Sequence, residues 1–430
     1  MAVRSQDHAD IVVVGAGAAG LMAAIFAGRT AREGGHASAR VVALDGAKSL
    51  GAKILVAGGG RCNVTHHAVN ERDYAGSTPG AIKSVLRRFR VADTVSFFEE
   101  FGVKLKREDT GKLFPTTDKA RTVLNALIEA CHRAGVEIRN PARVDRVERA
   151  PGGSGFIVEG AWGRIECGRV VIATGGMALP KSGSDGHGYS IVRKLGHTTT
   201  ERIFPALVPL VVGDASRSLT ELSGIATRAT LEVRSGTNKR LHDETNDLLC
   251  THFGLSGPGV LNVSRHYLDA RANDPDAKLL ICWLPGERFE SVDRLLQELG
   301  ARTPASWLRE RLPDRLGRAL CIGAGVDPST PGASLLREPR RRLARAITEM
   351  EVSVERDRGF THAEVTAGGV PLSELDLATM ESKVCPGLHL VGEILDVDGR
   401  IGGFNFQWAW ASGYLAGCAA GSALKISAAG

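Results

Sequence analysis

Three glycines near the start of the chain, Gly15, Gly17 and Gly20, have the spacing of a turn that binds a pyrophosphate. In such a turn the first glycine allows a tight bend, the second lets the backbone approach the phosphates, and the third lets the following helix pack closely. The N–H groups at the start of that helix, which contains Ala18 and Ala19, face the phosphates. The spacing therefore predicts a bound dinucleotide.

An acidic residue, Asp45, ends the next expected strand, 25 residues after Gly20 (45 − 20). A carboxylate in this place accepts hydrogen bonds from the 2′-hydroxyl of a ribose and disfavours a 2′-phosphate. A lone GxGxxG is weak evidence, but here a strand precedes it, a helix follows it and an acid ends the second strand. The pattern favours FAD or NAD over NADP.

A second glycine cluster, Gly58 to Gly60, lies within the segment from Lys53 to Val64 and is followed by Arg61 and Asn63. Such a segment is typical of a loop laid along a ligand longer than the ribose of NAD, and a flexible surface turn is the alternative. Arg61 and Cys62 are also candidate catalytic residues. The Cys62 thiol could donate a proton, or it could simply pack within the loop.

A third catalytic candidate, His252, precedes a helix start at Ser256-Gly-Pro258, whose N–H groups could face an anionic or carbonyl group of a substrate. An ordinary buried helix cap is the alternative. Asp185 and His187 could lie near the cofactor or form a plain turn. None of these residues is identified as the catalytic acid or base. The eight cysteines are scattered without a CxxC pair, so no metal site is expected.

The elements that must position these residues follow an α/β pattern. Residues 10–14 predict a buried parallel strand, and residues 21–30 predict the helix after the turn. Residues 169–176 predict another buried strand, which contains Thr174 and Gly175 and returns the chain to the ligand. Further expected elements are strand 40–45, helix 118–134 and short antiparallel strands at 144–147, 156–158 and 164–166. Together they favour a flavoprotein over a simple dehydrogenase.

The carboxy-terminal segment predicts a helix at the flavin end of the ligand. A strand-like run ends at Gly392 and Glu393, which would close the sheet beside the pyrophosphate and ribityl chain. Gly402 and Gly403 would then start the last helix, whose positive end stabilises negative charge on a flavin. The alternative, an amphipathic core helix, explains its aromatic residues but not the double glycine and Asn405.

Composition bounds the class of protein. The chain has 430 residues, of which 43% are hydrophobic and 24% charged, as in a soluble globular enzyme of two or three domains. Glycines interrupt the longest uncharged run, residues 11–28, and the first residues have no apolar signal core, so a cytoplasmic protein is expected. The net charge of +6 and the run Arg340 to Arg345 permit an RNA partner, although such runs are more often solvated helix faces.

A series of motifs runs through nearly the whole chain: VGAGAAG, AGGGRCNVT (57–65), GKLFPTTDKA (111–120), IATGGMALPKSGSDGHGY (172–189), THFGLSGPGVLNVSR (251–265), EVTAGGV (364–370), MESK and GEILDVDGRIGGFNFQWAWASGYLAG. This series resembles the BaiN/RdsA (YhiN-like) family of NAD(P)/FAD-dependent oxidoreductases. The resemblance implies an α/β fold in which a Rossmann-like FAD domain, residues 1–195 and 360–430, is interrupted by a β-barrel, residues 196–255 and 320–359, and by a small helical region, residues 256–319.

By this resemblance Val144 contacts the adenine through its backbone, and Arg61 and Asn63 belong to the flavin-side loop. Asp396 and the residues from Gly402 to Asn405 belong to the ribityl and isoalloxazine end. The expected cofactor-binding set is Gly15, Gly17, Ala18, Ala19, Gly20, Asp45, Lys53, Gly60, Arg61, Asn63, Val144, Thr174, Gly175, Gly392, Glu393, Asp396, Gly402, Gly403, Phe404 and Asn405.

The family has been linked to reduction of carbon–carbon double bonds in steroid-like compounds, to amine oxidation and to dihydrouridine formation in ribosomal RNA. The leading expectation is a reductase that adds hydride from flavin N5 to an unsaturated bond, with uridine in ribosomal RNA as the acceptor. A small-molecule ene-reductase, an amine oxidase and a non-catalytic flavin-binding protein are the alternatives. Since no second strand–GxGxxG–helix unit exists, NADH or NADPH would visit the flavin transiently.

Overall fold

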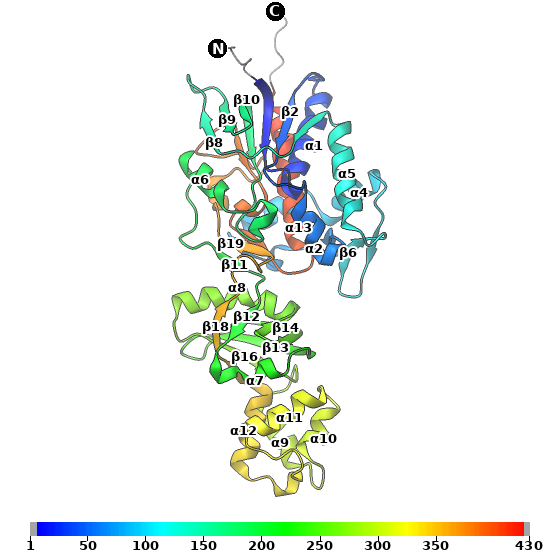
Figure 1. The fold of residues 1–430 in the computed structure, drawn as a ribbon, viewed down its shortest axis with the longest axis vertical. Helices are drawn as coiled ribbons and strands as arrows, with labels where there is room; N and C mark the ends of the chain where they lie inside the picture. Colours follow the sequence, from blue (N-terminus) through cyan, green and yellow to red (C-terminus); the bar gives the residue numbers. More distant parts are fainter. Residues whose placement is uncertain (1–6, 425–430) are drawn as a thin grey trace, which may run out of the picture. The chain divides into compact units, whose positions relative to one another are not determined.

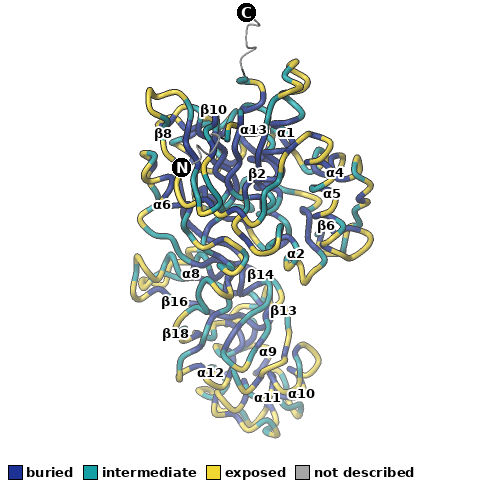
Figure 2. The backbone as a smooth tube through the Cα atoms, turned by 45° about the horizontal axis from the view of Figure 1, so that its top comes forward, coloured by how far each residue is buried: buried dark blue, intermediate teal, exposed yellow. Residues whose placement is uncertain are grey.

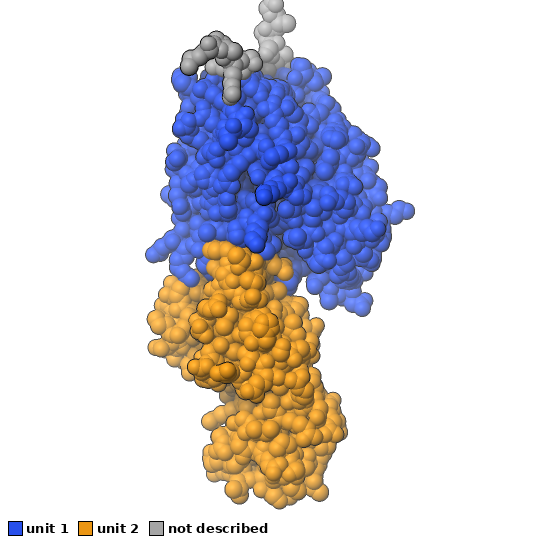
Figure 3. Space-filling model, viewed as in Figure 1, with its two compact units in different colours: residues 1–204, 365–430 blue, residues 205–364 orange. Residues whose placement is uncertain are grey.

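The computed structural model describes residues 7–424 and divides the chain into two compact units (Figures 1 and 3). Unit 1 contains the residues up to 204 and those from 365 onward, and unit 2 contains residues 205–364. The crossings expected near 195 and 360 therefore lie a few residues later in the chain. Within residues 7–424 no helix is both long enough and apolar enough to span a lipid bilayer.

The core of unit 1 is a mixed sheet with the strand order β7-β2-β1-β10-β9-β8, in which β20 also pairs with β10. Strands β7, β2, β1, β10 and β20 run parallel to one another, whereas β9 is antiparallel to both β10 and β8. The bounds are β1 (Asp7–Val14), β2 (Val41–Leu44), β7 (Val136–Arg139), β8 (Arg146–Arg149), β9 (Phe156–Gly160), β10 (Gly163–Ile172) and β20 (Leu388–Leu390).

Two features of this sheet differ from the sequence expectation. The strands expected at 164–166 and 169–176 are one strand, β10, because it pairs with β1 from Ile165 to Ile172 while its first half also pairs with β9. Strand β7 supplies a third parallel unit beyond β2, which the sequence analysis did not predict. About ninety residues of sequence separate it from β2, so no local pattern links the two strands.

Helices α1 and α13 pack side by side against the sheet, and both contain long buried stretches (Figures 1 and 2). The contact depends on Gly413, Gly417 and Gly421, because a Cβ at these positions would lie 2.4–2.6 Å from backbone oxygens of α1. The helices of unit 1 are α1 (Ala18–Glu33), α2 (Ala52–Gly60), α3 (Pro79–Leu86), α4 (Val91–Glu100), α5 (Ala120–Arg133), α6 (His187–Lys194) and α13 (Phe404–Ser422).

Short strands complete unit 1. Strand β6 pairs with β3 and β5, and β21 pairs with β4. Strand β11 (Phe204–Ala206) spans the first crossing between the units. The other short strands are β3 (Thr65–His66), β4 (Tyr74–Gly76), β5 (Leu105–Arg107), β6 (Lys112–Pro115), β19 (Val365–Ala367) and β21 (Val397–Gly399).

Unit 2 is built on a sheet with the order β17-β16-β13-β14-β15-β12-β18. Its two outer strands are consecutive in the chain and separated only by Ser353, so the sheet curls round on itself as the expected barrel would. Its strands are β12 (Leu210–Val212), β13 (Ala226–Arg234), β14 (Arg240–Thr251), β15 (Gly254–Ser256), β16 (Lys278–Cys282), β17 (Met350–Val352) and β18 (Val354–Asp357).

The helical part of unit 2 is displaced from the expected range of 256–319. Helix α8 buries Val260 and Val263 in the core beneath β13 and β14, and β16 follows it, so residues 258–282 belong to the sheet. The separate helices begin at Phe289 and end at Thr348. The helices of unit 2 are α7 (Ser218–Glu221), α8 (Pro258–Asn273), α9 (Phe289–Gln297), α10 (Pro304–Arg309), α11 (Asp314–Gly323) and α12 (Arg337–Thr348).

Candidate functional site

The turn between β1 and α1 is packed too closely for any side chain at two of its three glycines. A Cβ at Gly15 would lie 2.4 Å from the carbonyl oxygen of Ala173, and a Cβ at Gly20 would lie 1.8 Å from that of Gly15. Gly17, the residue before α1, would place a Cβ in open space. The packing holds the turn in shape and leaves the backbone at Gly17 accessible to a ligand at the amino terminus of α1.

Asp45 follows β2 and closes the same turn. One carboxylate oxygen accepts the Ala16 N–H at 2.8 Å, and the other accepts the Ala47 N–H at 2.8 Å. Burial raises the pKa of this carboxyl group. The Asp45 carbonyl accepts the Ala142 N–H at 2.6 Å, which brings the segment of Val144 beside it. Each carboxylate oxygen retains a lone pair that could accept a ribose hydroxyl.

The glycine cluster at Gly58–Gly60 lies at the end of α2. All three residues have left-handed φ values, 58°, 69° and 85°, so the chain leaves the helix through a bend that favours glycine. Lys53, which was expected in the loop, lies in the regular first turn of α2. The loop proper is therefore shorter than the sequence analysis predicted.

Arg61 is paired within unit 1. Its Nη1 lies 2.6 Å from Glu108 Oε1 and 3.7 Å from Asp118 Oδ1. Its guanidinium lies over the ring of Phe114, 4.0 Å from the centroid. These contacts direct Arg61 toward the sheet of β5 and β6, where it stabilises the glycine loop.

Cys62 is fully buried and has a left-handed φ of 61°. Burial raises the pKa of its thiol to about 12, so the group stays protonated near neutral pH. Its N–H donates to the carbonyl of Ala57 at 2.9 Å. These observations favour the role in loop packing over that of a proton donor to a substrate.

Glu393 joins four segments of unit 1 that are far apart in the chain. One of its oxygens pairs with Lys53, and the other accepts the Thr366 N–H at 3.0 Å. The Thr366 hydroxyl in turn accepts the N–H groups of Met177 at 2.7 Å and Ala178 at 3.0 Å. The ion pair thus brings the expected residues Lys53 and Glu393 together with the loop that follows β10.

The start of α13 is a second place where a glycine is required. Gly403 has a φ of 94°, and a Cβ there would lie 2.6 Å from the carbonyl carbon of Thr65. Gly402 has a φ of 129°. The ring of the first helical residue, Phe404, stacks on His66 with centroids 4.9 Å apart. Strand β3 therefore supports the amino terminus of α13 directly.

Gly392 and Asp396 are also held by neighbouring elements. The Gly392 N–H donates to Ser412 Oγ at 3.0 Å, and its carbonyl accepts the Trp408 indole N–H at 3.2 Å, so both groups bind α13. The Asp396 carbonyl accepts the Ser77 N–H at 2.8 Å. The backbone of the segment between β20 and α13 is therefore held by hydrogen bonds to neighbouring elements.

Two amide side chains at the start of α13 have structural partners. Asn405 accepts the Gly399 N–H at 2.8 Å and donates to the Gly399 carbonyl at 2.9 Å, so its side chain holds the preceding strand. Gln407, which the sequence analysis did not single out, accepts the hydroxyls of Thr65 at 2.7 Å and Thr94 at 2.9 Å. Its partners are more than 300 positions away, so no local spacing could have identified it.

The remaining candidates do not join this group. His252 lies in unit 2, exposed on the turn between β14 and β15, with its ring against Phe253. In α12, Arg340 pairs with Asp293 at 2.9 Å and Arg342 donates to the carbonyl of Ala324 at 3.0 Å. These partners within unit 2 favour a structural role for both arginines.

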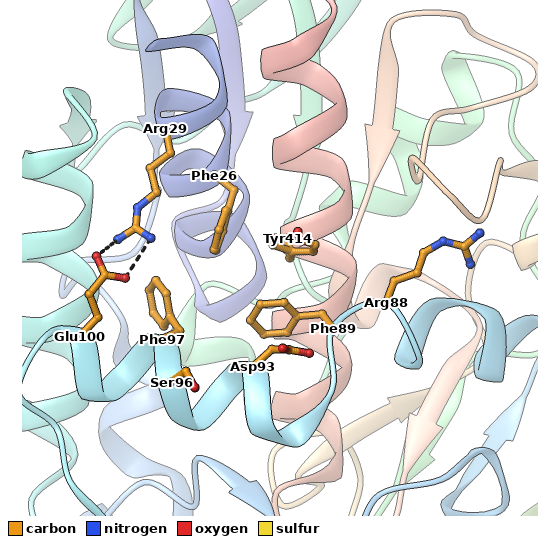
Figure 4. A pocket seen from close by; sticks show the side chains of 9 residues that line it. All are labelled: Phe26, Arg29, Arg88, Phe89, Asp93, Ser96, Phe97, Glu100 and Tyr414. Atoms are coloured by element: carbon orange, nitrogen blue, oxygen red, sulfur yellow. Dashed lines mark hydrogen bonds and ion pairs between the residues drawn. The ribbon is translucent and has the colours of Figure 1, made fainter. Parts of the chain in front are cut away.

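Unit 1 also has a small pocket between α1, α4 and α13, with a volume of about 280 Å³ (Figure 4). Aromatic rings, including those of Phe26, Phe97 and Tyr414, line it, and Arg29 pairs with Glu100 at its edge at 2.7 Å. None of the expected cofactor-binding residues lines this pocket.

The model of the HI0933-like protein Rossmann domain matches residues 9–419. The chain is 33% identical over 414 residues to the 3-dehydro-bile acid delta(4,6)-reductase of Clostridium scindens, covering 95% of this chain and 98% of that one. It is 32% identical over 423 residues to the ribosomal RNA dihydrouridine synthase of Escherichia coli, covering 95% and 97%. The resemblance inferred from the motifs is confirmed: the chain belongs to the HI0933-like Rossmann-domain family of FAD-dependent oxidoreductases.

Proposed function

We propose that unit 1 binds FAD between the glycine-led starts of α1 and α13 and transfers hydride to a carbon–carbon double bond of its substrate. The observation that carries this proposal is the meeting of distant segments at the carboxyl ends of the parallel strands, where Lys53 pairs with Glu393 and the loop after β10 joins them. Open α/β sheets bind their ligands at this edge.

Two polar groups support the fit of a dinucleotide. Asn63 Oδ1 and Thr174 Oγ1 are buried and have no hydrogen-bond partner among residues 7–424. Both belong to the expected cofactor-binding set, and Thr174 is followed by Gly175, whose φ is 72°. Buried polar groups are rarely left unpaired, so a ligand rich in oxygen and nitrogen atoms suits them.

The protein's own groups divide the work along this ligand. The N–H groups at the start of α1 bind the pyrophosphate, and Asp45 accepts a ribose hydroxyl. The N–H groups at the start of α13 stabilise negative charge at the other end. FAD, when bound, supplies a centre that accepts and releases hydride. The protonated thiol of Cys62 packs beneath the glycine loop and keeps its proton.

The names of the relatives support the choice of reaction. A delta(4,6)-reductase and a dihydrouridine synthase both saturate carbon–carbon double bonds. The proposed substrate therefore carries a double bond conjugated to a carbonyl group. Uridine in ribosomal RNA is the leading candidate, and a small unsaturated ketone is the second, favoured by the bile-acid reductase at 33% identity. NADH or NADPH is the proposed electron donor.

The test of this function is an anaerobic absorbance titration of the FAD-loaded protein. We expect NADH or NADPH to bleach the flavin band, and an unsaturated acceptor to restore it. Uridine-containing RNA and an enone are added separately to the reduced protein. If neither restores the band and an amine bleaches the oxidised protein instead, the reductase assignment is overturned.

Salt dependence separates the two substrate classes. Binding of RNA through several phosphate contacts weakens steeply as salt rises, whereas binding of an uncharged enone does not. Arg341 and Arg345, which lie over Phe289, are the members of the basic run to replace, since Arg340 and Arg342 have structural partners. An RNA affinity unchanged in the double variant Arg341→Ala, Arg345→Ala would leave that run as a solvated face.

A further inference from the structure

A segment that belongs to neither glycine-led helix start lies beside the expected adenosine end of the ligand. A Cβ at Gly183 would lie 3.4 Å from the Cβ of Ala47, two residues after Asp45. Two residues further on, Asp185 pairs with Arg143 at 2.7 Å. Residues 183–189 therefore pack against both sequence neighbourhoods that the cofactor assignment gives to adenosine, those of Asp45 and Val144.

Three hydroxyl groups in and beside this segment are buried and have no hydrogen-bond partner among residues 7–424: Thr174 Oγ1, Ser184 Oγ and the Tyr189 hydroxyl. Ser184 is 5% exposed and Tyr189 is 3% exposed. Burying an unpaired hydroxyl costs free energy, so three in one region are unlike ordinary packing.

Glycines make room for two of these hydroxyls. A Cβ at Gly175 would lie 2.5 Å from Ser184 Oγ, and a Cβ at Gly188 would lie 1.9 Å from Thr174 Oγ1. Alanine at either position would collide with a hydroxyl. The loop after β10 and the start of α6 are thus fitted to each other around these groups.

Tyr189 extends the set toward the middle of the ligand. Burial raises the pKa of its phenol, and the carboxylates of Glu393 and Asp396 raise it further. The phenol therefore stays neutral and can donate a hydrogen bond. Glu393 is the residue that joins Lys53 and Thr366. The Tyr189 hydroxyl is therefore close enough to the Lys53–Glu393 ion pair to be affected by its charge.

We propose that Thr174, Ser184 and Tyr189 form a second wall of the dinucleotide site: the hydroxyls of Thr174 and Ser184 bind ribose and phosphate oxygens of the adenosine half, and that of Tyr189 binds the adenosine-side phosphate of the pyrophosphate. This inference rests on the proposed binding of FAD. It adds residues outside the glycine turn and assigns them to the half of the ligand that FAD shares with ADP and that FMN lacks. The three residues are positioning groups, remote from the transferred hydride.

The test compares the ligands ADP, FAD and FMN on the variants Thr174→Val, Ser184→Ala and Tyr189→Phe. Each variant should weaken the binding of ADP and FAD about tenfold, the effect of one lost hydrogen bond, and leave any binding of FMN unchanged. Calorimetric titration gives the three dissociation constants. Ser190→Ala, which removes an exposed hydroxyl of α6, is the matched control and should alter none of them.

The ligand-free variants supply a second readout with the opposite sign. Because the hydroxyls have no partner in the described part of the chain, their removal should leave the thermal midpoint of the ligand-free protein unchanged or raise it. A lower midpoint with unchanged affinity for ADP and FAD would assign the hydroxyls to the stability of the fold and overturn the proposal. Weaker FMN binding with unchanged ADP binding would place them at the flavin half and overturn it as well.

Wild-type protein keeps the proposal testable if a variant fails to fold. Hydrogen exchange at residues 183–189 should slow when ADP is added and not when FMN is added. Equal protection by both ligands, or by neither, contradicts the second wall. If the wild-type protein binds no FAD at all, the proposed function itself fails; if it binds FAD and the variants bind it equally well, only this inference fails.

Discussion

The two glycine-led helix starts of unit 1, those of α1 and α13, are held in place by different contacts. The turn before α1 is partly local: Gly20 packs on the backbone of Gly15, and both residues also contact Ala173, which follows β10. The start of α13 depends on Thr65, more than 300 positions earlier, whose backbone Gly403 touches. A local turn is readable from spacing, whereas a start built on a distant strand is readable only once the fold is known.

The largest effect is expected at the local contact in the turn before α1. In Gly20→Ala the added Cβ would lie 1.8 Å from the Gly15 carbonyl oxygen, so the helix or the turn must move. We expect a loss of about 4 kcal/mol or more in the free energy of unfolding, measured by chemical denaturation. Gly17→Ala is the matched variant: its Cβ meets no atom, so it should fold normally and bind FAD more weakly.

Equal stability of Gly20→Ala and Gly17→Ala would contradict this division of roles. It would mean that the close packing at Gly20 relaxes without cost, and that the spacing reflects the ligand alone.

A smaller effect is expected at the distant start. Gly403→Ala adds a Cβ 2.6 Å from Thr65 to a residue with a φ of 94°. We expect a loss of about 2 to 4 kcal/mol, because strand β3 can shift more readily than the body of a helix. Gly59→Ala is the control, since it has a φ of 69° and no neighbouring atom, and should cost only about 1 kcal/mol. If Gly403→Ala were no less stable than this control, the contact between Gly403 and Thr65 would not hold the start of α13.

The contacts of Gln407 test how α13 is held to the distant strand. Gln407→Leu removes its bonds with the hydroxyls of Thr65 and Thr94 and with the Phe89 carbonyl, and leaves those groups buried. We expect thermal denaturation to show a loss of about 2 kcal/mol. Gln407→Glu keeps the acceptor for both hydroxyls and separates their contribution from that of the Phe89 contact. Unchanged stability in Gln407→Leu would show that packing alone fixes the helix.

The smallest effect is expected at the amino end of β1, where Asp7 begins the strand. Asp7 pairs there with Arg40 and with Arg139, and hydrogen bonding from Arg40 holds the pKa of Asp7 below its usual range. A lowered folded pKa stabilises the protein above the unfolded value near 3.8 and loses that contribution as pH falls.

We therefore expect Asp7→Asn to cost about 1 kcal/mol at pH 7, after allowance for solvent screening, and almost nothing near pH 2. Denaturation at the two pH values measures the difference. FAD affinity should not change at pH 7. A stability loss independent of pH would assign the role of Asp7 to shape and not to charge.

The same contrast explains what the sequence could predict. Strand β1, the glycine turn, α1 and Asp45 lie within a few tens of residues and were located from spacing and apolar runs. Strand β7 was missed, because its partner β2 lies about ninety positions away. The helical region of unit 2 was misplaced, because α8 packs on β13 and β14 and its pattern alone does not distinguish that from a separate bundle.

Side-chain roles followed the same rule. Arg61 is expected at the flavin, and spacing did not predict its partners Glu108 and Phe114, which come from another strand pair. Asn405 is expected at the isoalloxazine, and spacing did not predict that its amide binds Gly399. Ser184 and Tyr189 lie within the motif at 172–189, but the motif gave them no role, and only their buried hydroxyls without partners among residues 7–424 draw attention to them. Residue type and spacing predict a turn well and a three-dimensional neighbourhood poorly.

The measurement that tests the account most directly is a crystal structure of the protein with FAD. We predict one FAD molecule with its pyrophosphate at the amino terminus of α1, its adenosine beside Asp45 and Ser184, and its isoalloxazine ring at Gly402 and Gly403. An FAD bound with its ring away from the start of α13, or with its pyrophosphate away from Gly17, would contradict the claim that the two helix starts serve one ligand.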